Sequence, residues 1–167
     1  MEKYIYFSDH IFSKGKKDIY DKEENRIGSL DLKSAFTSSV NVENKKGEVV
    51  IEGKFPSFSN KWAVSLSDGN ELGQVKSSLS FFTKRYKYKT STEQYEIESP
   101  ALSREYIIYD KYKKEAATFK KVNGLFEAAA FELRNNSDSL LTEELIAVVM
   151  GVNAIQKRRN NAASPAT

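Results

Sequence analysis

Apolar and polar residues alternate over most of the chain, and this period of two is typical of half-buried β-strands. Trp62, Val64 and Leu66 alternate strictly before Asp68-Gly69-Asn70, and a second alternating segment follows at residues 72–75. An Asp-Gly pair between two such segments is a strong hairpin signal, because glycine tolerates the positive φ that tight hairpin turns demand. The pattern therefore predicts a β-hairpin centred on this turn.

The same unit recurs along the chain as an apolar strand, an Asp or Asn, a polar turn, and an apolar residue followed by a small one. Its anchors are Asp21, Asn44, Asp68 and Asp110, which lie 23, 24 and 42 residues apart. A weaker hairpin, joining residues 86–88 to 95–97, fits inside the longest gap. About five consecutive hairpins are therefore predicted, with a last strand over residues 126–133. So many antiparallel strands need closure, since closure removes unpaired edges.

The end of the chain has a different pattern and predicts one helix over about residues 141–157. Thr142 is a plausible N-cap, Glu143 and Glu144 follow where the helix dipole favours acids, and residues 157–159 (Lys-Arg-Arg) stand where it favours cations. The segment is apolar on all sides, so it belongs inside protein or membrane. A membrane span needs about 20 apolar residues and this segment has about 11, so we expect burial inside protein and no transmembrane span.

Two residues interrupt this apolar helix. Asn153 is expected to find hydrogen-bond partners in the barrel, because a buried amide without them is costly. Gly151 is expected to let a strand approach closely. The alternative for both is a small-ligand pocket beside the helix. Residues 1–158 are accordingly predicted to form a single domain, and residues 159–167 a flexible tail.

Composition excludes several kinds of chemistry. The 167-residue chain has no cysteine, so disulfides, a Cys nucleophile and thiolate metal sites are absent, and its one histidine, His10, leaves little room for a His-based triad or metal site. The net charge of +3 is low for a nucleic-acid-binding domain, and the 12% of aromatic residues suits a barrel core. No secretory signal is recognisable, which favours the cytoplasm. No cofactor, metal or nucleic-acid partner is expected.

The layout resembles the LURP-one-related branch of the tubby-like C-terminal superfamily, which includes the phospholipid scramblases. The likeness spans roughly residues 3–156 and rests on short motifs in a fixed order. These are Tyr20-Asp21 with Ile27-Gly28, residues 66–69 (Leu-Ser-Asp-Gly) with Leu72-Gly73, Tyr109-Asp110 with Ala116-Ala117, and the end at residues 140–147 (Leu-Leu-Thr-Glu-Glu-Leu-Ile-Ala).

The resemblance implies a mainly β fold, a closed antiparallel barrel of about twelve strands around a central, buried, apolar C-terminal helix. A barrel of that size is too wide for its own side chains to fill, so an all-round apolar helix is a suitable plug. Tubby domains bind phosphoinositides, and scramblase-type members associate with membranes. No position here matches a specific headgroup motif, and the scramblases' cysteine-rich acylation segment is missing.

The densest basic segment is residues 84–89 (Lys-Arg-Tyr-Lys-Tyr-Lys). If it is a strand, Arg85, Lys87 and Lys89 share one face and Tyr86 and Tyr88 share the other. The three cations are therefore candidates for contacts with an anionic ligand. The alternative is a solvated barrel exterior over a core lined with tyrosine.

These observations predict a non-enzymatic, monomeric binding protein that recognises anionic phospholipid headgroups or the membrane surface, and that is cytoplasmic or peripheral to the membrane. This prediction depends largely on the family resemblance. Two alternatives stay open: a protein-interaction or regulatory module without lipid affinity, and a carboxylate-based hydrolase.

Overall fold

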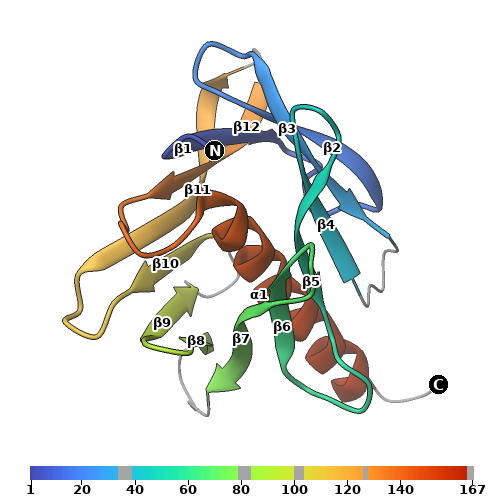
Figure 1. Ribbon diagram of the computed structural model, residues 1–167, viewed down its shortest axis with the longest axis vertical. Coiled ribbons are helices and arrows are strands. Elements are labelled where there is room, and N and C mark those ends of the chain that lie inside the picture. Colours follow the sequence, from blue (N-terminus) through green and yellow to red (C-terminus); the bar gives the residue numbers. More distant parts are fainter. Residues whose placement is uncertain (34–38, 79–83, 100–103, 126–127, 165–167) are drawn as a thin grey trace.

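The computed structural model describes residues 1–33, 39–78, 84–99, 104–125 and 128–164. It is a closed barrel of twelve antiparallel strands with one C-terminal helix, α1 (Thr142–Ala163), at its centre, so the predicted fold class is confirmed (Figure 1). The strands are β1 (Tyr4–Ser8), β2 (Gly15–Tyr20), β3 (Arg26–Leu32), β4 (Ser39–Asn44), β5 (Val49–Lys54), β6 (Trp62–Leu66), β7 (Glu71–Ser78), β8 (Lys84–Thr90), β9 (Gln94–Ser99), β10 (Tyr106–Tyr109), β11 (Glu115–Leu125) and β12 (Ala128–Asn135).

The barrel is a meander in which each strand pairs with the next, and β1 closes the ring against β12. Tyr4 stands opposite Arg134, and Phe7 stands opposite Phe131, in that closing pair. Because all twelve strands have a neighbour on both sides, the sheet has no open edge. The last strand had been predicted over residues 126–133; it is β12, and residues 126 and 127 fall outside the described part.

The recurring Asp or Asn of the sequence stabilises the tight turns through hydrogen bonds from its side chain. The Oδ1 atom of Asp21 accepts the backbone N–H groups of Glu23 and Asn25, both at 2.9 Å. Asn44, Asp68 and Asp110 do the same for the residue two positions on in their own turns. Because the chain reverses direction at every strand of the meander, the β2–β3, β4–β5, β6–β7 and β10–β11 connections lie at one end of the barrel, which we call the turn end.

The helix begins at the turn end. Its N-cap is Leu141, so the N-cap predicted at Thr142 is wrong by one residue. Glu144 supplies the capping interaction instead, because its Oε2 atom accepts the Leu141 N–H at 3.1 Å. Glu143, also in the first turn, pairs with the N-terminal amino group of Met1 at 2.9 Å. The acids predicted for the first turn are thus in place.

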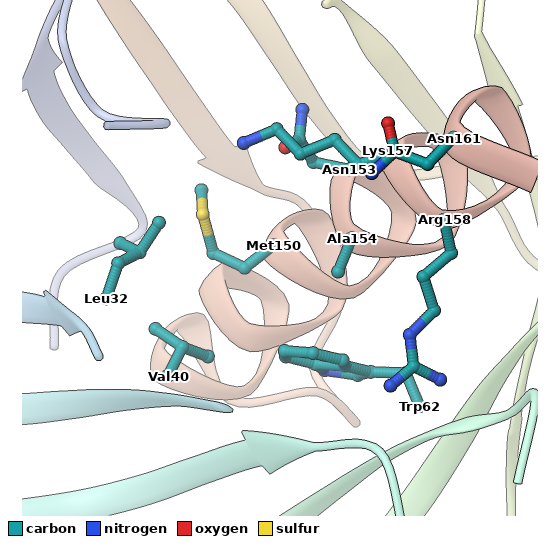
Figure 2. A pocket seen from close by; sticks show the side chains of 9 residues that line it. All are labelled: Leu32, Val40, Trp62, Met150, Asn153, Ala154, Lys157, Arg158 and Asn161. Carbon is teal, nitrogen blue, oxygen red and sulfur yellow. The ribbon is translucent and has the colours of Figure 1, made fainter. Parts of the chain in front are cut away.

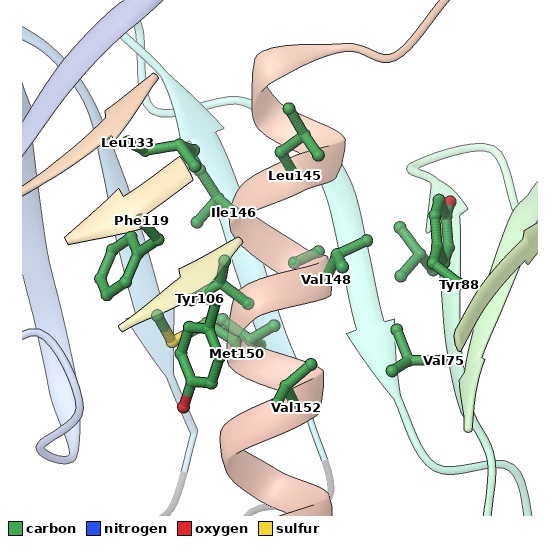
Figure 3. Close-up of a cluster of buried hydrophobic side chains, with 14 of the residues drawn as sticks. Val75, Tyr88, Tyr106, Phe119, Leu133, Leu145, Ile146, Val148, Met150 and Val152 are labelled. Carbon is green, nitrogen blue, oxygen red and sulfur yellow. The ribbon is translucent and has the colours of Figure 1, made fainter. Parts of the chain in front are cut away.

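From Leu145 to Ile155 the helix is buried on every side. The apolar residues from Leu145 to Ile155 pack against strands all around the barrel, and Figure 3 shows Val148 directed toward Val75 on one side while Phe119 and Leu133 lie on the other. Burial of six or more such side chains contributes roughly 10 kcal/mol. Because the sheet alone cannot fill its interior, this helix is the core of the molecule.

Trp62 fixes the position of the helix inside the barrel. Its indole Nε1 donates to the Ala147 carbonyl oxygen at 3.1 Å, and its ring lies directly over Gly151, where an added Cβ would be 2.7 Å from Cγ. Gly53 on β5 makes room for the same ring from the sheet side. The expected close approach at Gly151 therefore involves a tryptophan side chain on β6.

The helix continues six residues past the end that the sequence predicted, as far as Ala163. Residues 159–163, which the sequence analysis assigned to a flexible tail, are therefore helical. No periodic apolar pattern marks residues 160–163 in the sequence as part of the helix. The cations at residues 157–159 lie one turn or more before the end, and the last turn carries no basic residue. Their placement therefore needs an explanation other than the helix dipole.

Candidate functional site

The second end of the barrel is where α1 emerges and the longer connections lie, and we call it the mouth. Hydrogen bonds attach the helix to two of these connections: Lys157 Nζ donates to the Phe12 carbonyl at 3.3 Å, and Arg158 Nη1 donates to the Ser59 carbonyl at 3.3 Å. Phe12 is in the β1–β2 connection and Ser59 in the β5–β6 connection. In Figure 1 the C-terminus emerges at the lower right, away from the N-terminus.

The basic segment predicted as a ligand-binding face forms strand β8 and alternates as expected. Tyr86 and Tyr88 point into the core with 1% or less of their surface exposed, while Arg85 and Lys89 are exposed and Lys87 is half-buried. Lys76 on β7 stands opposite Lys87, which adds a fourth cation to this wall. The side chains are thus on one outer face, as the strand period requires.

Strand β9 brings acids to the same wall. Glu98 stands opposite Arg85, and their side chains form an ion pair at 3.3 Å. Glu96 stands opposite Lys87 and also pairs with Lys113 of the β10–β11 turn; Lys113, first, and then Lys87 and Arg85 hold the pKa of Glu96 below its ordinary value. Cross-strand register therefore neutralises part of the predicted site.

The mouth carries a cationic group that the sequence analysis did not single out. Among the residues that the structure describes, no carboxylate forms an ion pair with any of its members. Exposed cations elsewhere are often paired, for example Lys3 with Asp138 and Lys121 with Asp9. We call this group the mouth cations: Arg104, Lys157, Arg158 and Arg159.

Each arginine of the mouth is held by an aromatic ring or a hydroxyl group. Arg158 Cζ lies 3.3 Å from the centroid of the Phe55 ring, and Arg104 Cζ lies 5.4 Å from that of Phe12. Arg159 Nη1 donates to Ser77 Oγ at 3.0 Å. Stacking occupies one face of a guanidinium and leaves donors free at its edge, so these arginines can still bind a phosphate group.

Lys157 is the most enclosed member of the mouth cations. Burial, and then the nearby charge of Arg104, lower the pKa of Lys157 from its usual value. Repulsion between cations of this kind is relieved when an anion binds between them. The electrostatics of the mouth therefore favour a negatively charged ligand.

A groove of about 330 Å³ lies beside Arg158 and Arg159, and a smaller cavity of about 50 Å³ lies deeper. In Figure 2, Lys157 and Asn153 stand on one side of the smaller cavity and Arg158 and Trp62 on the other. The cavity has room for a water molecule, whereas the groove has room for a small polar headgroup. The other residues lining the groove are Phe55, Asn60, Ser77, Ile155 and Ala162.

Comparison with known proteins establishes the fold and goes no further. No protein-family model matches this sequence, and no curated protein matches it. One solved structure is similar, an X-ray structure of a protein from Arabidopsis thaliana. It superimposes with a TM-score of 0.59 over 90% of this chain and 91% of that one, at 13% sequence identity. The two proteins share an architecture.

Several other polar residues have structural roles or lie outside the mouth. The Oδ1 atoms of Asp21 and Asp68 accept backbone N–H groups of their own turns. Asp9 pairs with Lys121, so it does not orient the exposed His10. Asn153 is buried and interacts with the Tyr106 hydroxyl. Over the described ranges, no helix is long and apolar enough to cross a membrane, and no group of acids and His is arranged for a metal.

Glu144 is the acid most removed from solvent. Burial raises the pKa of its carboxyl group, although hydrogen bonds from the Tyr88 hydroxyl and the Leu141 N–H oppose that effect. It lies under the turn end against Tyr88, at 2.5 Å, rather than at the mouth. Among the residues that the structure describes, neither of the two mouth pockets has an acid in its lining.

Proposed function

We propose that this protein is a non-enzymatic, peripheral binding protein for anionic phospholipid surfaces, and that headgroup phosphates bind at the mouth. The observation that carries the proposal is the set of mouth cations, to which the described part of the chain supplies no carboxylate partner. Basic clusters near an anionic leaflet contribute about 1 kcal/mol per residue. A cytoplasmic location and membership in the LURP-one-related branch of the tubby-like superfamily belong to the same proposal, supported by the barrel around a central helix.

The predicted wall has a secondary role in this proposal. Arg85 is close to the mouth because Ser78, its partner on β7, adjoins Ser77, to which Arg159 is bonded. Lys87 and Lys89 continue the cationic stripe away from the mouth. Since Glu96 and Glu98 dilute the wall, its three cations are expected to contribute less per residue than Arg158 and Arg159.

The test is co-sedimentation with vesicles of phosphatidylcholine alone or with phosphatidylserine added, at low salt and at about 0.15 M salt. We expect binding to the anionic vesicles that weakens as salt rises. Arg158→Gln with Arg159→Gln removes two charges and is expected to weaken binding by about 2 kcal/mol, or about thirtyfold. Arg85→Ala, Lys87→Ala and Lys89→Ala together are expected to have a smaller effect.

The matched control is Lys45→Gln with Lys46→Gln, which removes two exposed charges from the turn end. It is expected to bind as the unchanged protein does. Equal losses in both double variants would show that net charge alone drives binding and would contradict a site at the mouth. No binding to either vesicle would overturn the proposal and favour the protein-interaction alternative.

A further inference from the structure

The β5–β6 connection, residues 55–61, exposes an aromatic side chain to solvent on a backbone conformation that disfavours it. Phe58 is fully exposed, at 110% of its reference surface, and its backbone has φ 58°. The Ser59 N–H donates to the Pro56 carbonyl at 3.1 Å and closes a turn in which Phe58 holds the third position. A positive φ at that position normally selects glycine or asparagine. Both the exposure and the backbone therefore disfavour phenylalanine here.

The connection is nevertheless held firmly at its base. Phe55, at its start, is buried and packs edge-on against Trp62 with ring centroids 5.0 Å apart. The Ser59 carbonyl accepts from Arg158, and the Lys61 N–H donates to Ser59 Oγ at 3.0 Å. The exposed ring is therefore carried by a turn that the barrel and the helix both position.

The surroundings of this turn are cationic. Lys61 closes the connection and is exposed, and the turn is bonded directly to Arg158, with Arg159 in the adjoining groove. An aromatic ring beside a group of cations matches the interface of an anionic bilayer, where rings lie at headgroup depth and cations meet phosphates. A purely cationic surface would account for the arginines but not for Phe58.

We propose that Phe58 inserts into the lipid interface and anchors the protein with its mouth toward the membrane. This inference rests on the proposed function and adds an orientation and a salt-resistant component of binding to it. Electrostatic attraction by the mouth cations is screened by salt, whereas transfer of the Phe58 ring from water is not.

The chain has no cysteine, so a single introduced thiol can be labelled without altering any other residue. Phe58→Cys carries an environment-sensitive NBD fluorophore at the mouth. Tyr112→Cys is the matched control, because Tyr112 is a 78% exposed aromatic residue in the β10–β11 turn, at the turn end. With phosphatidylserine-containing vesicles, we expect a blue shift, stronger emission and quenching by nitroxide-labelled lipid at position 58, and no change at position 112.

The outcomes separate this inference from the function on which it rests. If both labelled proteins sediment with the vesicles but position 58 keeps its emission in water, the anchor is refuted and anionic binding stands. Equal responses at both positions also refute it, because the protein would then lack a fixed orientation. Failure of both unlabelled and labelled protein to sediment refutes the function together with the anchor.

A substitution provides an independent test. Phe58→Asn suits the left-handed backbone and removes the ring, so we expect an unchanged or higher melting temperature and about tenfold weaker binding at moderate salt. Phe58→Trp is expected to retain binding. Full binding by Phe58→Asn at every salt concentration would overturn the proposal.

Discussion

At the scale of single residues, the Glu144 carboxyl group is the most consequential buried acid. It accepts the Tyr88 hydroxyl and the Leu141 N–H and so joins the start of α1 to β8. Because burial is the largest influence, the pKa of Glu144 is raised in the folded protein. The proton is therefore bound more tightly in the folded state than in the unfolded state, and folding stability depends on pH at this residue.

We predict that Glu144→Gln removes a pH-dependent component of stability. A raised pKa stabilises the fold fully below the unfolded value, and this contribution is lost as pH rises through the folded value. The melting temperature of the unchanged protein, relative to that of Glu144→Gln, is therefore expected to fall between about pH 4.5 and neutral pH. Thermal unfolding followed by circular dichroism across that range checks this.

The sign of that slope distinguishes Glu144 from the other perturbed acids. The hydrogen-bonded ion pair with Lys16, and then the Ser29 hydroxyl, lower the pKa of Glu43, although burial opposes them. Its contribution is present above the unfolded pKa and is lost as pH falls, which is the opposite trend. If the melting temperature of the unchanged protein, relative to that of Glu144→Gln, stays constant or rises with pH, the Glu144 carboxyl is not titrating as described.

At the scale of elements, the contact between α1 and β6 depends on one glycine. We predict that Gly151→Ala destabilises the protein by about 1–3 kcal/mol, since the new methyl group would overlap the Trp62 ring. The better helix propensity of alanine offsets part of that cost. Denaturant unfolding checks the value.

The control for this prediction is the same substitution in a Trp62→Leu background. A smaller side chain at position 62 leaves space for the added methyl group, so the two substitutions together are expected to cost less than the sum of the separate effects. Additive effects would place the cost of Gly151→Ala in the helix backbone rather than against Trp62.

The elements divide clearly into those that local sequence could predict and those that it could not. The tight turns were predictable because Asp21, Asn44, Asp68 and Asp110 act within their own turns. The end of the helix was not, because residues 160–163 (Asn-Asn-Ala-Ala) carry no periodic apolar pattern, and helix termini depend on weak local preferences.

The candidate site shows the same division. The outward direction of Arg85, Lys87 and Lys89 follows from strand alternation, but the acids of β9 reach them only through pairing register, which local patterns do not reveal. The mouth cations come from the β9–β10 connection and from α1. These segments are far apart in the sequence, and only the fold brings them together. The signal that could have found them was the Arg-Arg pair at residues 158–159, which had been attributed to the helix dipole.

At the scale of the whole molecule, the barrel and the helix form one cooperative unit. We predict that removal of residues 140–167 abolishes the folded state, because the roughly 10 kcal/mol contributed by the helix core is comparable to the entire net stability of a typical domain. The expected result is loss of both the cooperative melt and the β-type circular dichroism spectrum.

The matched control is removal of residues 160–167 alone. Residues 160–164 are exposed, so this shorter truncation is expected to keep a cooperative melt. A protein without residues 140–167 that still melted cooperatively would show that the barrel is stable when empty, and would contradict the role assigned to the helix.

The pairing of β1 with β12 also has a consequence for synthesis on the ribosome. The first strand to emerge has no second neighbour until Arg134 can reach Tyr4, and the segment that fills the interior follows later still. Until then, the earlier hairpins expose an apolar face and an unpaired strand edge, and both make an incomplete chain prone to aggregate. Contacts between such distant segments also slow folding. The barrel can therefore close and be filled only after β12 and α1 have been synthesised.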